Sequence, residues 1–359
     1  MGTTIRDVAF EAGVSTATVS RVLAVYERET AERARPVAEK TRLRVMAAIQ
    51  RLGYRVNYTA RGLKTQSTMA VGVVFPELAN DFFMDVAEGI ERELDSQGYT
   101  MILASSLNSI EEEKKRIYML ADRMVDGMVV IPAGSRGEHL QGLADTGMPM
   151  VLVDRLVEGA ALDAVTSDNE DGTFRLTRAL LADGFRRIAF VGGEITLSAA
   201  RERLSGYGRA LAEAGINPDP SWICLGGMEV EDGYKRMKTL LKKGNPPEAM
   251  VAVNLMVHLG MERCLLDMKG NGSRGQESRL TEPVIAGFDE SRYTPFLPAC
   301  RYTASQDAVG MGSRAGRRIV DKIRQKKSGK EETTGERIIR LPVTIVNSTN
   351  GGKHGGKSL

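Results

Sequence analysis

From Met69 onward the sequence alternates short, β-branched apolar runs with amphipathic segments of helical periodicity, in two successive series. The apolar runs predict buried strands at 70–75, 99–104, 127–132 and 149–154, and again at 187–192, 222–226, 248–253 and 283–288. The intervening segments predict helices near 82–97, 110–123, 137–145, 170–183, 198–214, 230–243 and 256–268. Alternating strands and helices form parallel sheets that are covered on both faces. Two series therefore predict two α/β lobes, with a ligand cleft at the carboxyl ends of their strands.

Composition restricts where such a chain can act. With 359 residues, of which 42% are hydrophobic, the chain can bury a sizeable core in two or three domains. Its longest apolar runs are far shorter than the ~20 residues that span a bilayer, so we expect no membrane contact. Residues 1–15 contain Asp7 and Glu11 and lack an apolar signal core, which indicates a cytoplasmic protein. Three isolated cysteines and three histidines without partners at ligand spacing predict neither a disulfide framework nor a metal site, and no cofactor is expected.

Positive charge is concentrated at the N-terminus. Residues 1–65 hold twelve Lys/Arg against six Asp/Glu, whereas the net charge of the whole chain is only +3. This excess has two interpretations, the solvated face of a small helical domain or a surface that binds nucleic acid. The local pattern of residues 3–23 separates them.

Residues 3–23, TTIRDVAFEAGVSTATVSRVL, predict two short helices joined by a tight turn. Thr3 or Thr4 can cap the first helix, Gly13 ends it, and Ser15 can cap the second. This is the pattern of a helix-turn-helix, whose second helix enters the major groove of DNA. The outward residues of that second helix are small or hydrogen-bonding: Thr16, Ala17, Thr18, Ser20 and Arg21.

These side chains suit close approach to DNA. Arg21 can pair bidentately with guanine, and Ala17 can contact a thymine methyl group. Hydroxyl groups at the helix start can hold phosphates. The alternative is an ordinary pair of surface helices, which share the same local pattern. We expect DNA contacts from Thr4, Ser15, Thr16, Ala17, Thr18, Ser20 and Arg21.

Three stretches in the same order, IRDVAFEAGVSTATVSRVL, KTRLRVMAAIQRLGYRVN (40–57) and ARGLKT (60–65), resemble the headpiece and hinge of the lactose/galactose repressor (LacI/GalR) family. The resemblance implies a third helix whose apolar stripe is formed by Val45, Ala48, Ile49 and Leu52. It also implies a hinge helix that contacts DNA through Asn57 and Ala60, with Leu63 as the wedge in the minor groove. The connection at 24–36 is about eight residues longer than is usual in the family. Its composition leaves open a polar extension of the second helix or a mobile loop, and Arg28, Arg33 or Arg35 is expected to add phosphate contacts.

Residues 69–348 resemble the type I periplasmic sugar-binding fold, which forms the effector domain of the same family. The clearest pieces are VLVDR, VTSDN, RRIAFVGG, ARERLSGY, IAGFDE and RLPVTIV. Matching these motifs implies an effector site of polar and aromatic residues: Asn80, Phe82, Phe83, Asp154, Arg203, Met228, Asn254, Asp289 and Gln306. Asp154 and Asp289 have a structural alternative, because either can cap a helix or pair with Arg155. Asp81 and Leu255 depart from the family's usual residues, and Leu255 puts a standard neutral sugar in doubt.

The predicted architecture is an all-α helix-turn-helix headpiece (1–56), a hinge and linker (57–68), a two-lobed α/β effector domain with parallel sheets (69–348) and a disordered tail (349–359). The implied function is a transcriptional regulator that binds a palindromic operator on double-stranded DNA as a homodimer. We expect it to be a repressor controlled by a sugar, sugar acid or sugar phosphate. A sugar-binding or sugar-modifying protein without a regulatory role is the alternative.

An enzyme is not expected, because no catalytic motif appears in the context that it needs. GGKHGGKS (351–358) matches the G-x-x-x-x-G-K-[ST] pattern of a phosphate-binding loop, but no helix follows it in this sequence. The stretch before it, RIIRLPVTIVNS (337–348), resembles the family's final strand, so we interpret that match as part of the tail.

Overall fold

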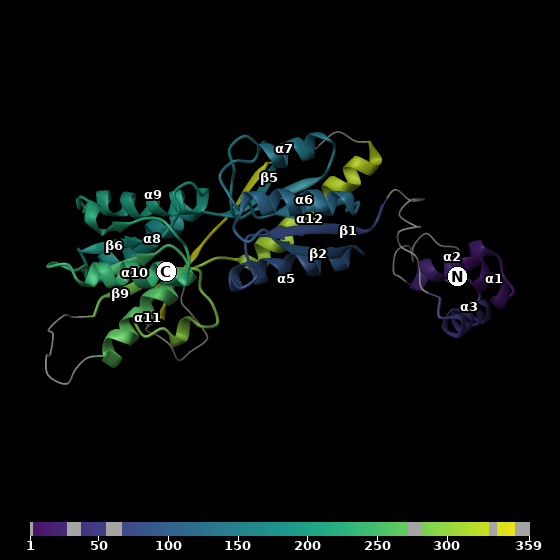
Figure 1. Ribbon diagram of the computed structural model, residues 1–359, viewed down its shortest axis with the longest axis horizontal. Coiled ribbons are helices and arrows are strands. Elements are labelled where there is room, and N and C mark those ends of the chain that lie inside the picture. The colour runs from purple at the N-terminus through teal and green to yellow at the C-terminus, as the bar shows by residue number, and fades with distance from the viewer. Residues whose placement is uncertain (1–2, 27–36, 55–66, 272–281, 330–335, 349–359) are drawn as a thin grey trace.

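The computed structural model describes residues 3–26, 37–54, 67–271, 282–329 and 336–348 of the chain. Three helices form a small N-terminal headpiece (Figure 1): α1 (Ile5–Ala12), α2 (Thr16–Tyr26) and α3 (Glu39–Leu52). Their apolar sides share one core, in which Val45 and Ala48 of the predicted third-helix stripe are buried. Ile49 and Leu52 pack against that core, so the stripe is confirmed.

The two headpiece caps follow the sequence prediction. Thr4, rather than Thr3, caps α1: its hydroxyl accepts from the N–H of Asp7, whose carboxylate accepts from the Thr4 N–H at 2.8 Å. Gly13 ends α1 with a φ of 61°, a conformation that glycine adopts without steric cost. The Ser15 hydroxyl accepts a backbone N–H three residues further on, at 3.2 Å, and so caps α2.

The first lobe is built on a parallel six-stranded sheet with the order β11-β5-β4-β3-β1-β2. Its strands are β1 (Ala70–Phe75), β2 (Thr100–Ser105), β3 (Gly127–Val130), β4 (Met150–Val153), β5 (Asp163–Ser167) and β11 (Ile338–Leu341). One face packs against α5 (Asp81–Ser96) and α12 (Ala308–Ser328). The other face packs against α6 (Ile110–Asp122) and α7 (Glu138–Asp145).

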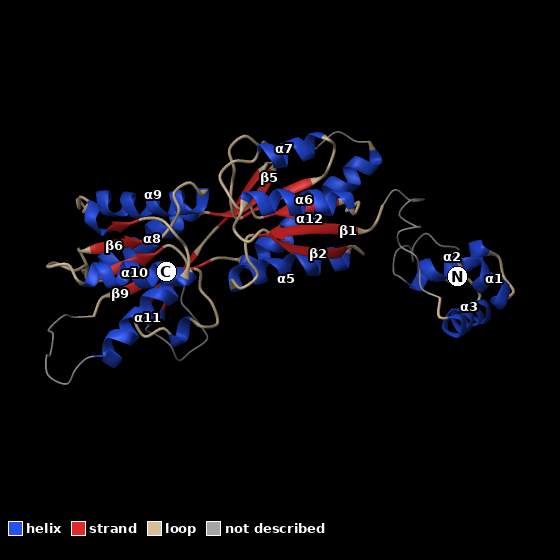
Figure 2. Ribbon diagram, in the orientation of Figure 1, coloured by secondary structure: helices blue, strands red, loops and turns tan. Residues whose placement is uncertain are grey.

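The second lobe is again a sheet flanked by helices (Figure 2). Its strand order is β12-β10-β9-β8-β6-β7. Its strands are β6 (Ile188–Val191), β7 (Ile223–Cys224), β8 (Ala249–Ala252), β9 (Val284–Phe288), β10 (Cys300–Ser305) and β12 (Thr344–Asn347). Its helices are α8 (Asn169–Ala182), α9 (Ser198–Glu213), α10 (Val230–Leu241) and α11 (Leu255–Asn271), with short 3-10 turns at η1 (Pro220–Trp222) and η2 (Thr294–Phe296). All pairs are parallel except β10 with β12, which is antiparallel and so differs from the all-parallel prediction.

Three connections join the lobes: β5 to α8, β10 to α12, and β11 to β12. The eight predicted strands and the helices between them are confirmed, whereas β5, β10 and α12 were not predicted. The stretch RIIRLPVTIVNS was expected to form one final strand, but it forms two, in different sheets. Pro342 lies between them and has no amide N–H to continue a strand ladder.

Helix α12 returns to the first lobe and crosses α5 at very short range. A Cβ placed on Gly89 of α5 would lie 2.1 Å from the carbonyl oxygen of Val309, and one placed on Gly312 of α12 would lie 2.0 Å from that of Val86. No side chain larger than hydrogen fits at either position. Two glycines therefore permit the backbone contact that ties the C-terminal part of the chain to the first lobe.

No helix in the described part of the chain has both the length and the apolar composition needed to cross a membrane. The three cysteines are free thiols, of which Cys264 and Cys300 are buried.

Candidate functional site

Helix α2 presents the predicted DNA-contacting side chains on its outer surface. Thr16, Ala17, Ser20 and Arg21 are exposed, and Thr18 is half-buried. The Arg21 guanidinium is held only by long hydrogen bonds to its own helix, from Nε to the Ala17 carbonyl at 3.4 Å and from Nη2 to the Thr18 hydroxyl at 3.3 Å. Since both hydrogen bonds are long and exposed, Arg21 can exchange them for a base edge or a phosphate at little cost.

Some predicted DNA contacts lie outside the described residues. These are Asn57, Ala60 and Leu63 of the implied hinge, and the inserted stretch 27–36 with its three arginines. Helix α2 continues as far as Tyr26, so residues 24–26 of the longer connection belong to the second helix. The phosphate-loop match at 351–358 also lies outside the described residues.

A cavity of about 210 Å³ lies between the two α/β lobes, at the carboxyl ends of their strands. Its position matches the rule that open parallel sheets bind ligands at these ends. Eight of the nine predicted effector residues line it: Asn80, Phe82, Phe83, Asp154, Arg203, Met228, Asn254 and Asp289. The ninth, Gln306, lies behind Asp289 rather than on the cavity wall.

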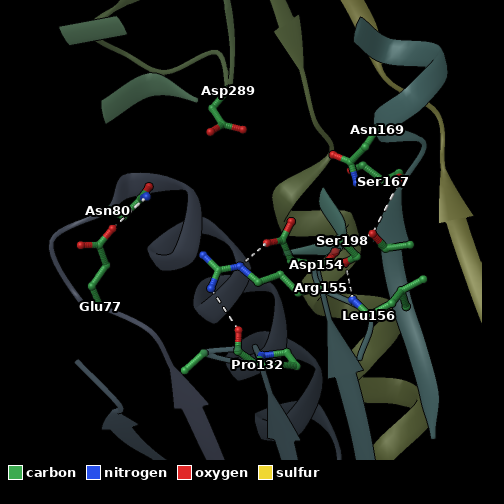
Figure 3. A network of polar contacts seen from close by, with 12 residues as sticks. Glu77, Asn80, Pro132, Asp154, Arg155, Leu156, Ser167, Asn169, Ser198 and Asp289 are labelled. Atoms are coloured by element: carbon green, nitrogen blue, oxygen red, sulfur yellow. Dashed lines mark hydrogen bonds and ion pairs between the residues drawn. The ribbon is translucent and has the colours of Figure 1, made fainter. Parts of the chain in front are cut away.

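The loop after β1 supplies one wall. Asn80 caps α5, because its side-chain oxygen accepts the N–H of Phe82 at 3.1 Å, and its amide nitrogen donates to Glu77 at 3.2 Å (Figure 3). The rings of Phe82 and Phe83 follow directly, tilted, with centroids 5.6 Å apart. This wall combines an apolar surface that can pack on a sugar ring with the carboxylate of Glu77.

Asp154 and Arg155 lie together at the end of β4, and both are buried. Arg155 donates from Nη1 to the Pro132 carbonyl at 3.0 Å, while its Nε lies 3.7 Å from Asp154 Oδ2 (Figure 3). The other carboxylate oxygen, Oδ1, is buried and has no hydrogen-bond partner among the described residues. Burial raises the pKa of the Asp154 carboxyl, although Arg155 and Arg203 oppose that shift. Asp154 thus keeps an unused acceptor in the cavity, beyond its expected pairing with Arg155.

Arg203 of α9 is fixed by four contacts. Its Nε donates to Asn169 at 2.8 Å, and its Nη1 donates to the Val253 carbonyl at 2.7 Å. Nη2 lies 4.0 Å from a carboxylate oxygen of Asp289, and the guanidinium stacks on the Phe288 ring at 3.7 Å. A buried cation held in this way is oriented before any ligand arrives, which favours binding.

Asp289 and Asn254 come from the ends of β9 and β8. Asp289 accepts from the side chain of Gln306 and from the N–H of Leu255 at 3.4 Å. Asn254 donates to the carbonyl of Met228 at 3.1 Å, and its oxygen accepts a backbone N–H in the first turn of α11 at 2.9 Å. Both residues therefore support the start of α11 as well as line the cavity, so the structural alternative for Asp289 holds in part.

Motif matching missed four further carboxylates on the cavity wall, Glu77, Glu194, Glu229 and Asp232. Of these, Asp232 forms an ion pair with Arg236 at 3.1 Å. Glu77 follows β1, Glu194 follows β6 and Glu229 follows β7. The rule that ligands bind at the carboxyl ends of parallel strands could have found them, had it been applied to every strand.

An ion pair between the lobes is connected to the cavity residue Arg203 through the side chain of Asn169. Arg340 of β11 donates from both terminal nitrogens to Glu202 of α9, at 3.0 and 2.9 Å. Asn169 donates to the same carboxylate at 3.4 Å and accepts from Arg203. A change in the hydrogen bonds of Arg203 can therefore alter the ion pair between Arg340 and Glu202, which joins the two lobes.

Comparison with known proteins agrees with both parts of this architecture. The family described as periplasmic binding proteins and sugar binding domain of LacI family matches residues 68–345, and bacterial regulatory proteins, lacI family, matches residues 4–57. The HTH-type transcriptional regulator RegA of Clostridium saccharobutylicum is 33% identical over 91% of this chain and 94% of its own length. The HTH-type transcriptional repressor PurR of Pasteurella multocida is 30% identical over 95% and 98%.

Solved structures give the same result. The lac repressor dimer bound to operator and the anti-inducer ONPF superimposes with a TM-score of 0.78 at 25% identity, covering 97% of this chain and 98% of that one. The complex of the transcriptional regulator CelR with cellobiose gives 0.66 at 27% identity, covering 96% and 98%. These relatives are transcriptional regulators rather than enzymes. The chain belongs to the LacI family of DNA-binding transcriptional regulators, with a helix-turn-helix headpiece and an effector-binding domain.

Proposed function

We propose that this regulator binds a palindromic operator as a homodimer in the cytoplasm and represses transcription, under the control of a sugar or sugar derivative. The observation that carries the proposal is the pre-oriented Arg203 beside Asp289 in a cavity between two lobes, in a chain that also presents Arg21 on an exposed recognition helix. One module reads DNA and the other senses a metabolite.

The DNA-binding role is assigned to one side of the headpiece. Arg21 reads a base edge in the major groove, and the hydroxyls at the start of α2 hold phosphates. Two headpieces are needed because operator symmetry mirrors the symmetry of a dimer. The lac repressor in the operator-bound structure is itself a dimer, which supports this assembly.

The sensing role is assigned to the cavity. Asp154 and Asp289 accept hydroxyl protons, Arg203 and Asn254 lie beside them, and Phe82 covers a ring face. The CelR structure holds cellobiose, which supports a carbohydrate ligand. Effector binding changes the angle between the lobes and hence operator affinity, so the operator must change effector affinity by the same factor.

The proposal is tested by selecting binding sites from random duplex DNA with the full-length chain. A palindromic site and a mobility shift that gives one dimer per site are the expected results. A half-site bound equally well by one chain would contradict the dimer, and no enrichment over random DNA would contradict sequence-specific regulation. Adding candidate effectors to the selected operator then shows whether the effector weakens or strengthens binding.

A further inference from the structure

We propose that the effector is a hydroxylated ring compound that carries a protonated amine, with the ammonium group between Glu77 of the first lobe and Glu229 of the second. This inference rests on the proposed function, because it concerns the effector cavity of that function. It goes further by giving the effector's charge.

The cavity wall is strongly acidic. Its charged residues are six carboxylates and two guanidiniums: Glu77, Asp154, Glu194, Glu229, Asp232 and Asp289 against Arg155 and Arg203. Both arginines are already engaged, Arg155 by Asp154 and a backbone carbonyl, and Arg203 by Asn169, a backbone carbonyl and Asp289. An anionic ligand in this cavity would therefore have few free cationic donors to bind and several carboxylates that repel it.

The inner end of the cavity is close to electrically balanced, but one of its buried acceptors has no hydrogen-bond partner among the described residues. Asp154 and Asp289 come from opposite lobes, and their carboxylates point toward one another across the cleft (Figure 3). Asp154 Oδ1 is buried without a partner, which costs free energy until a donor arrives. Hydroxyl groups of a ring compound can supply that donor without adding charge.

The outer end is different, because two of its carboxylates, Glu77 and Glu229, have no neutralising cation among the described residues. Glu77 is half-buried and Glu229 is exposed at the cavity mouth, and neither forms an ion pair with a described residue. Partial desolvation raises the pKa of Glu229, and the carboxylates of Glu77 and Asp232 raise it further. Like charges on the two lobes oppose approach of the lobes. An ammonium group between them would convert that repulsion into attraction from both sides.

The same argument disfavours sugar acids and sugar phosphates. A phosphate in this cavity would lie among Glu77, Glu194 and Glu229 instead of the arginine or lysine cluster that phosphates normally need. The charge of the wall therefore selects amine-bearing members from the broader class of sugar derivatives.

The test uses the full-length chain and sets of hexoses that differ in one substituent. D-Glucosamine, D-galactosamine and D-mannosamine are each compared with the N-acetyl derivative, which keeps the nitrogen but removes the charge, with the parent hexose, and with the hexose 6-phosphate. Thermal unfolding and titration calorimetry measure binding. We expect at least one free amine to raise the unfolding temperature and to bind at least about tenfold more tightly than its N-acetyl and phosphate counterparts.

Charge-removing variants then locate the ammonium group. Glu77→Gln and Glu229→Gln should each weaken binding of the amine, roughly three- to tenfold, and leave binding of the N-acetyl counterpart unchanged. Glu91→Gln on α5 and Glu213→Gln on α9 remove exposed carboxylates outside the cavity wall and should change neither. An equal loss of amine affinity in all four variants would show that only the net charge of the protein matters, and would overturn the proposal.

Other outcomes overturn the proposal in separate ways. No response to any free amine would do so, and so would a preference for the parent hexose or the phosphate. A third outcome concerns metal ions. If CaCl2 or MgCl2 alone stabilised the chain, and Glu77→Gln and Glu229→Gln abolished that stabilisation, these carboxylates would bind a metal ion instead of an amine. A neutral or anionic ligand that binds in the cleft and alters operator binding would leave the proposed function intact while refuting the amine. Failure to select an operator would refute that function without affecting the binding result.

Discussion

Asp154 and Asp289 occupy matching positions in the two lobes. Each is the first residue after a central strand, β4 or β9, and each has a positive φ, 64° and 71°. Each donates its backbone N–H to the neighbouring strand of its sheet. Asp154 donates to the carbonyl of Val165 in β5, and Asp289 donates to that of Ala304 in β10. This backbone conformation is uncommon outside glycine, and aspartate tolerates it better than most residues. The repeat places one carboxylate from each lobe at the cavity.

Replacing Asp154 with asparagine should stabilise the ligand-free chain at pH 7. Because burial raises the carboxyl pKa above its usual 3.8, the folded state binds the proton more tightly than the unfolded state. Above the folded-state pKa the charged carboxylate therefore lowers the free energy of unfolding. This destabilisation disappears as the pH falls through that pKa. Thermal unfolding should show a higher midpoint for the variant at pH 7, and this gain should shrink toward acidic pH. A gain that did not change with pH, or a loss, would contradict this explanation.

Arg203→Ala should abolish the effector response while operator binding remains. The substitution leaves Asn169 and Asp289 without a buried partner, so it should also destabilise the chain, by roughly 3–5 kcal/mol. Arg203→Lys keeps the charge but cannot reproduce the forked contacts, and it tests the response in a more stable protein. Arg201→Ala, on the exposed side of the same helix, is the control. If the effector still altered operator affinity in Arg203→Lys and Arg203→Ala, the cavity assignment would be wrong.

Arg21→Ala should lower affinity for the selected operator by roughly 1–3 kcal/mol if the guanidinium reads a guanine. Its present hydrogen bonds are long and exposed, so the headpiece itself should remain folded. The measurement is binding to the operator and to random DNA at several salt concentrations. Equal losses on both would mean that Arg21 contacts only phosphate, and the salt slope would then fall by about one unit.

The contact between Arg340 and Glu202 should contribute to coupling between the lobes. Both side chains are partly exposed, so a double-mutant cycle with Arg340→Ala and Glu202→Gln should give a modest coupling free energy of roughly 0.5–1 kcal/mol for unfolding. The larger change should appear in the effector-induced shift of operator affinity, because Glu202 contacts Arg203 through Asn169. If the effector-induced shift of operator affinity were unaltered in both single variants, coupling through Arg340 and Glu202 would be excluded.

Two glycines offer a matched test of helix packing. Gly89→Ala should destabilise the first lobe by roughly 1–3 kcal/mol, because the new Cβ would meet the Val309 carbonyl of α12. Gly208→Ala in α9 has open space around the added methyl group and should stabilise the chain by about 0.5–1 kcal/mol. Chemical unfolding of both variants distinguishes steric contact from helix propensity. Effects of the same sign would contradict the packing explanation.

Most of the effector site could be predicted from the sequence, because strand ends are local features. VLVDR and GFDE each mark an apolar strand that ends in an aspartate, and parallel sheets bring such ends to one edge. Gln306 was placed among the lining residues, yet it lies behind Asp289, since one hydrogen bond between side chains decides its position. Glu77, Glu194 and Glu229 were missed because they lie in loops that carry no periodic pattern.

The sequence by itself determined the alternation of strands and helices, the two headpiece caps and the exposed side of the recognition helix, because each depends on residues within a few positions of one another. Only the tertiary structure decided that β11 and β12 belong to different sheets, that Arg340 meets Glu202, and that Glu77 and Glu229 share a cavity. The pairing of β11 with β5, the contact of Arg340 with Glu202 and the shared cavity of Glu77 and Glu229 each join segments more than 100 residues apart. They arise from how the chain crosses between the lobes, which local pattern does not record.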